Sequence, residues 1–146
     1  MSRIRRFDHV GMTVADLDAA SAFFVELGFE VEGRTFLEGE FLDTVIGIPD
    51  SRTEIVMLRP RHGGAGLELA SFIRPNHEPG SPAAMASELG LRSVVSEVDD
   101  PAGDHRTAGK RRLWPGRRHR RVQHVWRMAS VRGPEGIIVS LAERID

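Results

Sequence analysis

Hydrophobic and polar residues alternate over residues 7–14, "FDHVGMTV", a pattern typical of a β-strand with one buried face. Val10 and Val14 lie on the apolar side of this predicted strand, whereas His9 points to the other side. The strand therefore presents an imidazole, which can bind protons or metal ions, opposite its apolar side chains.

A helical pattern follows this strand. Asp16 is suited to the N-cap, because its carboxylate can accept a hydrogen bond from an amide of the first helical turn. Gly28 predicts the end of the helix. Between them, apolar residues recur at three- and four-residue spacings, namely Leu17, Ala20, Phe24 and Leu27.

Three further alternating segments, at residues 29–36, 53–60 and 66–73, predict three more strands in the first half of the chain. A short helical run within "EGEFLDTVIGIPDS" separates the first two of these segments and ends at Gly47 and Pro49. If this short helical run is not counted, the elements predicted for the first half follow the order β-α-β-β-β.

The second half begins and ends like the first. "LRSVVSEVDD" (91–100) aligns with "FDHVGMTVAD" (7–16), so that Ser93 takes the place of His9. Near the C-terminus, "VWRMASV" and "GIIVSLAE" predict two strands joined by a Pro-Glu-Gly turn. Residues 75–89, which are rich in Pro, Ser and Ala, predict a linker between the halves.

Residues 101–124 interrupt this repeat. They contain eight Arg or Lys residues and one Asp, with no helical period or strand alternation where the repeat requires a helix and a strand. One interpretation is a basic loop that binds phosphate or nucleic acid. The other, which we favour, is a reading-frame error, because a shifted frame of GC-rich DNA encodes mainly Arg, Pro, Gly and Ala.

Composition excludes several functions. The chain of 146 residues is long enough for one compact domain, and it has no cysteine, which excludes disulfides and thiolate chemistry. Its formal net charge of −1 argues against nucleic-acid binding by the chain as a whole. No segment is long and apolar enough to span a bilayer, and the N-terminus lacks the apolar core of a signal peptide. We therefore expect a cytoplasmic protein with no membrane partner.

Four segments, "FDHVGMTVADLDAASAFF", "GLELASFIRP", "LRSVVSEVDD" and "VRGPEGIIVSLAER", resemble the vicinal oxygen chelate superfamily. That superfamily includes glyoxalase I, methylmalonyl-CoA epimerase, extradiol dioxygenases and the bleomycin- and fosfomycin-resistance proteins. The resemblance implies an α+β fold in which two βαβββ modules form a cup-shaped mixed sheet around a small-molecule ligand. It implies one domain over residues 1–146, with module 1 at 5–74, a linker at 75–89 and module 2 at 90–146. A homodimer is also implied, because exposed sheet edges tend to pair.

The resemblance also implies a divalent metal (Zn, Ni, Fe, Mn, Co or Mg) held by the first and last strand of each module. In this chain those positions are His9 and Glu68 in module 1, and Ser93 and Ser140 in module 2. A neutral serine hydroxyl is a poor ligand for first-row metals, and three protein ligands are the usual minimum in a catalytic site. We therefore predict that His9 and Glu68 form an incomplete ligand set, which leaves the cofactor undetermined.

His9 and Glu68 are also the candidate catalytic residues, because a carboxylate orients a neighbouring imidazole and the pair can then act as an acid or base. The first hypothesis is a glyoxalase-, bleomycin-resistance- or dioxygenase-like protein that binds a small organic molecule, with lyase, isomerase or dioxygenase activity. A non-catalytic antibiotic-binding protein and a metal-free acid–base enzyme are the alternatives, so enzyme activity itself is left open. The predicted cavity-lining residues are Ser93, Ser140, Phe72, Trp126 and Met128.

Overall fold

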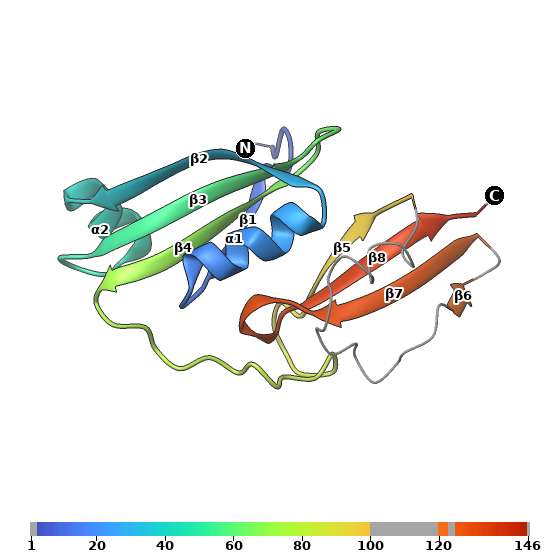
Figure 1. Ribbon diagram of the computed structural model, residues 1–146. Helices are drawn as coiled ribbons and strands as arrows, with labels where there is room; N and C mark the ends of the chain where they lie inside the picture. The colour runs from blue at the N-terminus through green and yellow to red at the C-terminus, as the bar shows by residue number, and fades with distance from the viewer. Residues whose placement is uncertain (1–2, 100–119, 123–124, 146) are drawn as a thin grey trace. The chain divides into compact units, whose positions relative to one another are not determined.

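The computed structural model describes residues 3–99, 120–122 and 125–145 of the chain. The chain divides into two compact units, Met1–Pro79 and Gly80–Asp146, each with its own four-stranded mixed sheet (Figure 1). These two strand-rich modules confirm the predicted α+β fold. The grouping of both modules in one domain stays a prediction, and the anomalous segment 101–124 lies outside the described residues except for 120–122.

The sheet of the first unit has the strand order β1-β4-β3-β2. Strand β1 runs parallel to β4, whereas β3 is antiparallel to both of its neighbours. The strand order along the chain is the one predicted, and the short helical run forms α2. The elements are β1 (His9–Thr13), α1 (Leu17–Glu26), β2 (Phe29–Glu38), α2 (Glu40–Ile46), β3 (Arg52–Pro60) and β4 (Gly66–Arg74).

Helix α1 begins and ends where the sequence predicts. The Asp16 carboxylate accepts a hydrogen bond of 2.9 Å from the Ala19 amide, which satisfies one of the free N–H groups of the first turn. Gly28 follows the helix with a φ of 99°, a left-handed conformation that glycine adopts without a steric penalty. The buried side chains of the helix are Leu17, Ala20, Phe23 and Phe24.

Replacing Asp16 with alanine is expected to lower the free energy of unfolding by about 1 kcal/mol, because the N-cap hydrogen bond to Ala19 is lost. Urea denaturation followed by circular dichroism measures the change. Asp16→Asn is the matched control, since asparagine caps helices about as well as aspartate. Equal destabilisation by both substitutions would contradict the capping role.

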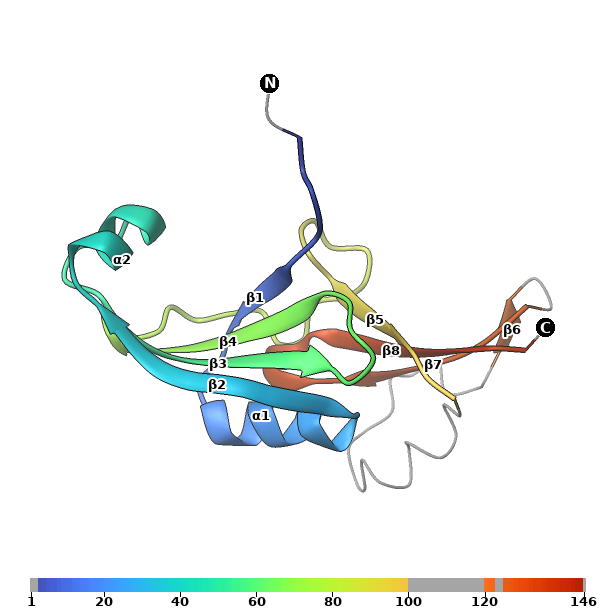
Figure 2. The ribbon, with the colours of Figure 1, turned by 90° about the horizontal axis from the view of Figure 1, so that it is seen from above.

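The first sheet has two different faces. The strand residues that point toward α1 form the core of the unit, and Figure 2 shows α1 on one side of the sheet and α2 on the other. Because side chains alternate along a strand, the neighbours of these core residues point away from α1. The buried strand residues of the α1 face are Phe29, Val56, Leu58, Leu67 and Leu69, and Val14 extends this face just after β1.

Helix α2 is attached to the start of β3 through one carboxylate. Asp43 accepts hydrogen bonds from the Ser51 amide (2.9 Å), the Ser51 hydroxyl (2.6 Å) and the Asp50 amide (2.8 Å). These bonds, the Ser51 hydroxyl first, lower the pKa of Asp43. Gly47 ends the helix in a left-handed conformation with a φ of 72°. The helix is therefore held in place by the hydrogen bonds of Asp43, in its middle, rather than by buried side chains of its own.

The second unit repeats the strand order of the first as β5-β8-β7-β6, with β5 parallel to β8. The sequence pattern did not predict β6, which lies in the Arg-rich segment. This strand has no apolar alternation, and its register with β7 places Arg120 opposite Met128 and Val122 opposite Trp126. The elements are β5 (Ser93–Glu97), β6 (Arg120–Val122), β7 (Trp126–Arg132), the 3₁₀-helix η1 (Pro134–Gly136) and β8 (Ile138–Arg144).

Candidate functional site

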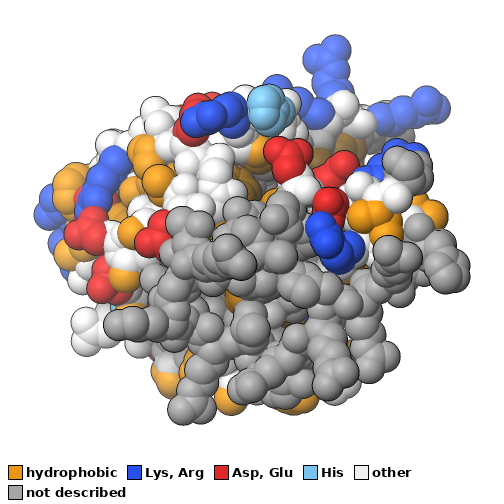
Figure 3. Space-filling view, turned by 45° about the vertical axis from the view of Figure 1, so that its right-hand side comes forward, with side chains coloured by type: hydrophobic (Ala, Val, Ile, Leu, Met, Phe, Trp, Pro, Cys, Tyr) orange, Lys and Arg blue, Asp and Glu red, His pale blue; other side chains and the backbone are white. Residues whose placement is uncertain are grey.

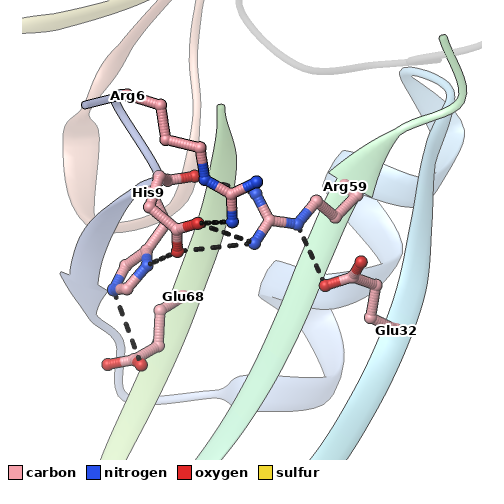
Figure 4. Close-up of polar contacts among 6 residues, drawn as sticks. Arg6, His9, Glu32, Arg59 and Glu68 are labelled. Atoms are coloured by element: carbon pink, nitrogen blue, oxygen red, sulfur yellow. Dashed lines mark hydrogen bonds and ion pairs between the residues drawn. The ribbon is translucent and has the colours of Figure 1, made fainter. Parts of the chain in front are cut away.

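His9 and Glu68 lie on adjacent strands of the first sheet and on the same face. Gly11 of β1 is opposite Glu68 of β4, so His9 is displaced by two residues along β1 and points to the same side. Figure 4 shows the two side chains approaching each other, with His9 Nε2 3.8 Å from Glu68 Oε2. Their side chains are 37% and 31% exposed, so both are accessible to a ligand.

Asp8 holds the other side of the His9 ring. Its Oδ2 atom lies 2.7 Å from His9 Nδ1, and its carboxylate also contacts Arg6 at 2.7 Å and Arg59 at 3.4 Å. These contacts lower the pKa of Asp8 to about 2. The hydrogen bond with His9 is the largest cause, ahead of the positive charges of Arg59 and Arg6. Asp8 is therefore ionised at neutral pH. The alternation of apolar and polar residues did not indicate that Asp8 belongs to this site.

A glycine lets Arg59 reach Asp8. Gly66, the register partner of His9, is buried, and a Cβ atom at this position would lie 3.2 Å from Arg59 Nη1 and 2.6 Å from the Leu58 carbonyl oxygen. With no side chain there, Arg59 Nη1 donates a 2.9 Å hydrogen bond to the carbonyl oxygen of Asp8. On its other side, Arg59 Nε donates to Glu32 at 3.0 Å (Figure 4). Gly66 and Arg59 thus hold Asp8 in place, and Asp8 in turn positions His9.

The contacts of Asp8 predict an acid-dependent contribution to stability. Because its pKa is lower in the folded chain than the ordinary 3.8, these contacts stabilise the fold above that pH, and the contribution is lost as the pH falls from 3.8 through about 2. We expect the difference in unfolding free energy between the wild type and Asp8→Asn to shrink over this range. Urea denaturation at a series of acidic pH values measures it. A difference that stays constant with pH would show that the Asp8 charge is not involved.

Apolar side chains share the face of the sheet that carries Glu68. Met57 of β3 is the direct register partner of Glu68, and Ala70 and Phe72 follow it at alternate positions of β4. All three are half-buried. The Phe72 ring makes an edge contact with His77, whose Nε2 accepts a 3.0 Å hydrogen bond from the Phe72 amide. Phe72 therefore lies on the face of Glu68, and its role in lining a cavity stays a prediction.

The predicted residues of the second unit share one face of its sheet. Ser140 of β8 lies opposite Ser130 of β7 and Val95 of β5. Ser140 is only 7% exposed, and its hydroxyl oxygen lies 2.7 Å from that of Ser130. Its neighbour is thus another hydroxyl rather than a base that could activate it as a nucleophile. By the alternation of β5 and β7, the same face carries Ser93, Trp126 and Met128.

The described donor set does not fit a catalytic first-row metal. His9 and Glu68 supply two donors, whereas three protein ligands are usual in such sites. Over residues 3–99, 120–122 and 125–145, no group of three or more His, Cys, Asp or Glu side chains is placed to hold a metal ion. A site with two protein ligands therefore stays a prediction.

Charged side chains of opposite sign lie next to one another on the described surface (Figure 3). In the first unit, Arg34 contacts both Asp18 at 2.6 Å and Glu54 at 2.5 Å. Arg61 likewise contacts Glu30 at 2.9 Å. Paired charges of this kind do not favour the binding of a polyanion to the first unit.

Comparison with known proteins supports the fold. The family model of the Glyoxalase/Bleomycin resistance protein/Dioxygenase superfamily matches residues 6–140. The structure is similar to a glyoxalase family protein from Bacillus cereus, with 30% identity, 99% of this chain and 97% of that chain covered, and a TM-score of 0.92.

More distant structures show the same fold. An antibiotic-binding protein from Streptomyces has 18% identity over 99% of this chain and 100% of that chain, with a TM-score of 0.64. A glyoxalase family protein from Enterococcus faecalis has 19% identity over 95% of this chain and 98% of that chain, with a TM-score of 0.63. No curated protein sequence matches the chain.

Proposed function

Because the chain belongs to the glyoxalase/bleomycin resistance protein/dioxygenase superfamily, we propose that it binds a small organic molecule on the face of the first sheet that carries His9 and Glu68. The supporting observation is an accessible imidazole and carboxylate beside the half-buried side chain of Met57, on a sheet face that also carries Phe72 farther along β4. A few polar groups among apolar side chains are typical of small-molecule sites, in which the polar groups orient the ligand. Similarity to an antibiotic-binding protein supports the same proposal.

Calorimetric titration of the full chain with copper-free bleomycin, in the presence of EDTA, tests this proposal. We expect saturable binding that His9→Ala and Glu68→Ala each weaken at least about tenfold, because a hydrogen bond to a charged group contributes about 1.5–3 kcal/mol. Glu26→Ala is the matched control, since Glu26 is an exposed carboxylate at the end of α1.

Two outcomes of this titration would contradict the proposal. One is the absence of binding by the wild-type chain both in EDTA and after Zn²⁺ is added. The other is that the His9→Ala and Glu68→Ala variants bind bleomycin as strongly as the control variant Glu26→Ala. Loss of binding in EDTA, with recovery on addition of Zn²⁺, would show instead that the two-donor site works with a metal.

A metal-free acid–base enzyme is the second candidate, and the contact between Asp8 and His9 favours it. A histidine that acts as a general base is commonly oriented by a third group, and Asp8 contacts the ring nitrogen farther from Glu68. Isomerase and lyase assays run in EDTA separate the two candidates. Turnover that His9→Ala abolishes favours the enzyme, whereas bleomycin binding without turnover favours the binding protein.

The remaining predictions about partners rest on the sequence. In the described parts of the chain, no helix has the length and apolar character needed to cross a membrane. The homodimer, the cytoplasmic location and the lack of nucleic-acid binding stay predictions. So does the lining of a ligand cavity by Ser93, Ser140, Phe72, Trp126 and Met128.

A further inference from the structure

We infer that Asp8 is a positioning residue that fixes the proton of His9 on Nδ1, and that His9 Nε2 and Glu68 together bind a protonated amine of the ligand. The second part rests on the proposed function, since it names the chemical group that the site takes. The first part concerns the ligand-free chain and is tested without any ligand.

The hydrogen bond between Asp8 and His9 determines the tautomer. An ionised carboxylate only accepts hydrogen bonds, so at 2.7 Å from Asp8 Oδ2 the Nδ1 atom must carry a proton. Arg6 and Arg59 also contact the Asp8 carboxylate, at 2.7 and 3.4 Å, and these two positive charges favour its ionised form. In a neutral imidazole with its proton on Nδ1, Nε2 is an acceptor.

This tautomer leaves two acceptors side by side. His9 Nε2 and Glu68 Oε2 are 3.8 Å apart, which is too long for a hydrogen bond between them. A single donor atom about 2.9 Å from each can bridge the two acceptors. An ammonium group suits this position because it has several N–H donors and no acceptor.

The charges around the pair also favour a cation. Glu68 adds a negative charge on the face of the sheet, and the neighbouring cations Arg6 and Arg59 contact Asp8 and Glu32. Met57, the register partner of Glu68, offers an apolar surface to the hydrocarbon part of an amine. A carboxylate ligand would instead face Glu68 and an acceptor nitrogen, which disfavours its binding.

Nitrogen NMR of the histidine rings in the full, ligand-free chain tests the positioning role at mildly alkaline pH. His9→Gln identifies the His9 signals among those of the six histidines. We expect His9 to be protonated on Nδ1 in the wild type and to become a mixture of tautomers in Asp8→Asn. Asp18→Asn is the control, because Asp18 contacts Arg34 and should leave the ring signals unchanged. A proton on Nε2 in the wild type, or no response to Asp8→Asn, would overturn the inference.

Titration with benzylamine and benzoate, which are similar in size and opposite in charge, tests the ligand class by the same signals. We expect benzylamine to shift the His9 ring signals, Glu68→Gln to weaken its binding at least about tenfold, and benzoate to bind at least about tenfold more weakly than benzylamine. Preference for benzoate would overturn the assignment. The assignment would also be overturned if benzylamine did not bind although bleomycin bound and His9→Ala weakened that binding. The proposed function would stand in that case. If none of these ligands binds, the proposed function fails as well.

Discussion

Replacing Phe24 with alanine is expected to destabilise the first unit by about 3–5 kcal/mol, which is the usual cost of removing a large aromatic side chain from a core. Phe24 is fully buried in α1, with an exposed fraction of 0%. Its ring makes edge contacts with Phe23 and Phe29 at centroid distances of 5.0 and 5.7 Å. The substitution would therefore leave a cavity between α1 and the sheet.

Phe41→Ala is the matched control, because Phe41 belongs to α2 and is 84% exposed. We expect it to change the free energy of unfolding by no more than about 0.5 kcal/mol. Far-ultraviolet circular dichroism during urea denaturation reports on the first unit, because both of the α-helices within the described ranges belong to it. Similar effects of the two substitutions would show that α1 does not pack on the sheet as described.

Gly66→Ala is expected to destabilise the first unit by about 1–3 kcal/mol, which is typical of inserting a group into a packed region. The new methyl group would lie 2.6 Å from the carbonyl oxygen of Leu58 in the adjacent strand. A backbone atom cannot move aside as a flexible side chain can, so β3 and β4 would have to separate. Arg59 would lose its path to Asp8, and the orientation of His9 would change with it.

Gly33→Ala provides the same chemical change at an open position of the same sheet. Apart from its two chain neighbours, no residue has an atom within 4 Å of a Cβ at position 33, so we expect a change of no more than about 0.5 kcal/mol. Urea denaturation of both variants measures the difference. The histidine NMR signals should shift in Gly66→Ala only, and a neutral effect of Gly66→Ala would contradict the close approach of the two strands.

The sequence pattern was sufficient to predict the elements of the first unit. Alternation located its strands, and Asp16 and Gly28 located both ends of α1, because caps and left-handed glycines depend on local interactions alone. The same alternation placed His9 and Glu68 on the faces where they are found. A shared face requires only the period of two residues and the register between β1 and β4.

The residues that position His9 could not be predicted in this way. In a regular strand Asp8 would point away from His9, but β1 begins at His9, so the Asp8 side chain is free to turn toward the ring. The contact between Arg59 and Asp8 joins residues 51 positions apart and depends on the register of three strands. Strand β6 was missed for a different reason, since its residues Arg120–Val122 lack the apolar alternation on which strand prediction relies.

Mapping the ligand by amide NMR tests the central claim most directly, namely that a small organic ligand binds on the face of the first sheet away from α1. The full chain is titrated with copper-free bleomycin, and the change in each backbone amide signal is followed. We predict the largest changes at His9, Met57 and Glu68, with the amides of α1 unaffected. Changes confined to α1, or no change at His9 and Glu68 when the ligand is bound, would contradict the account.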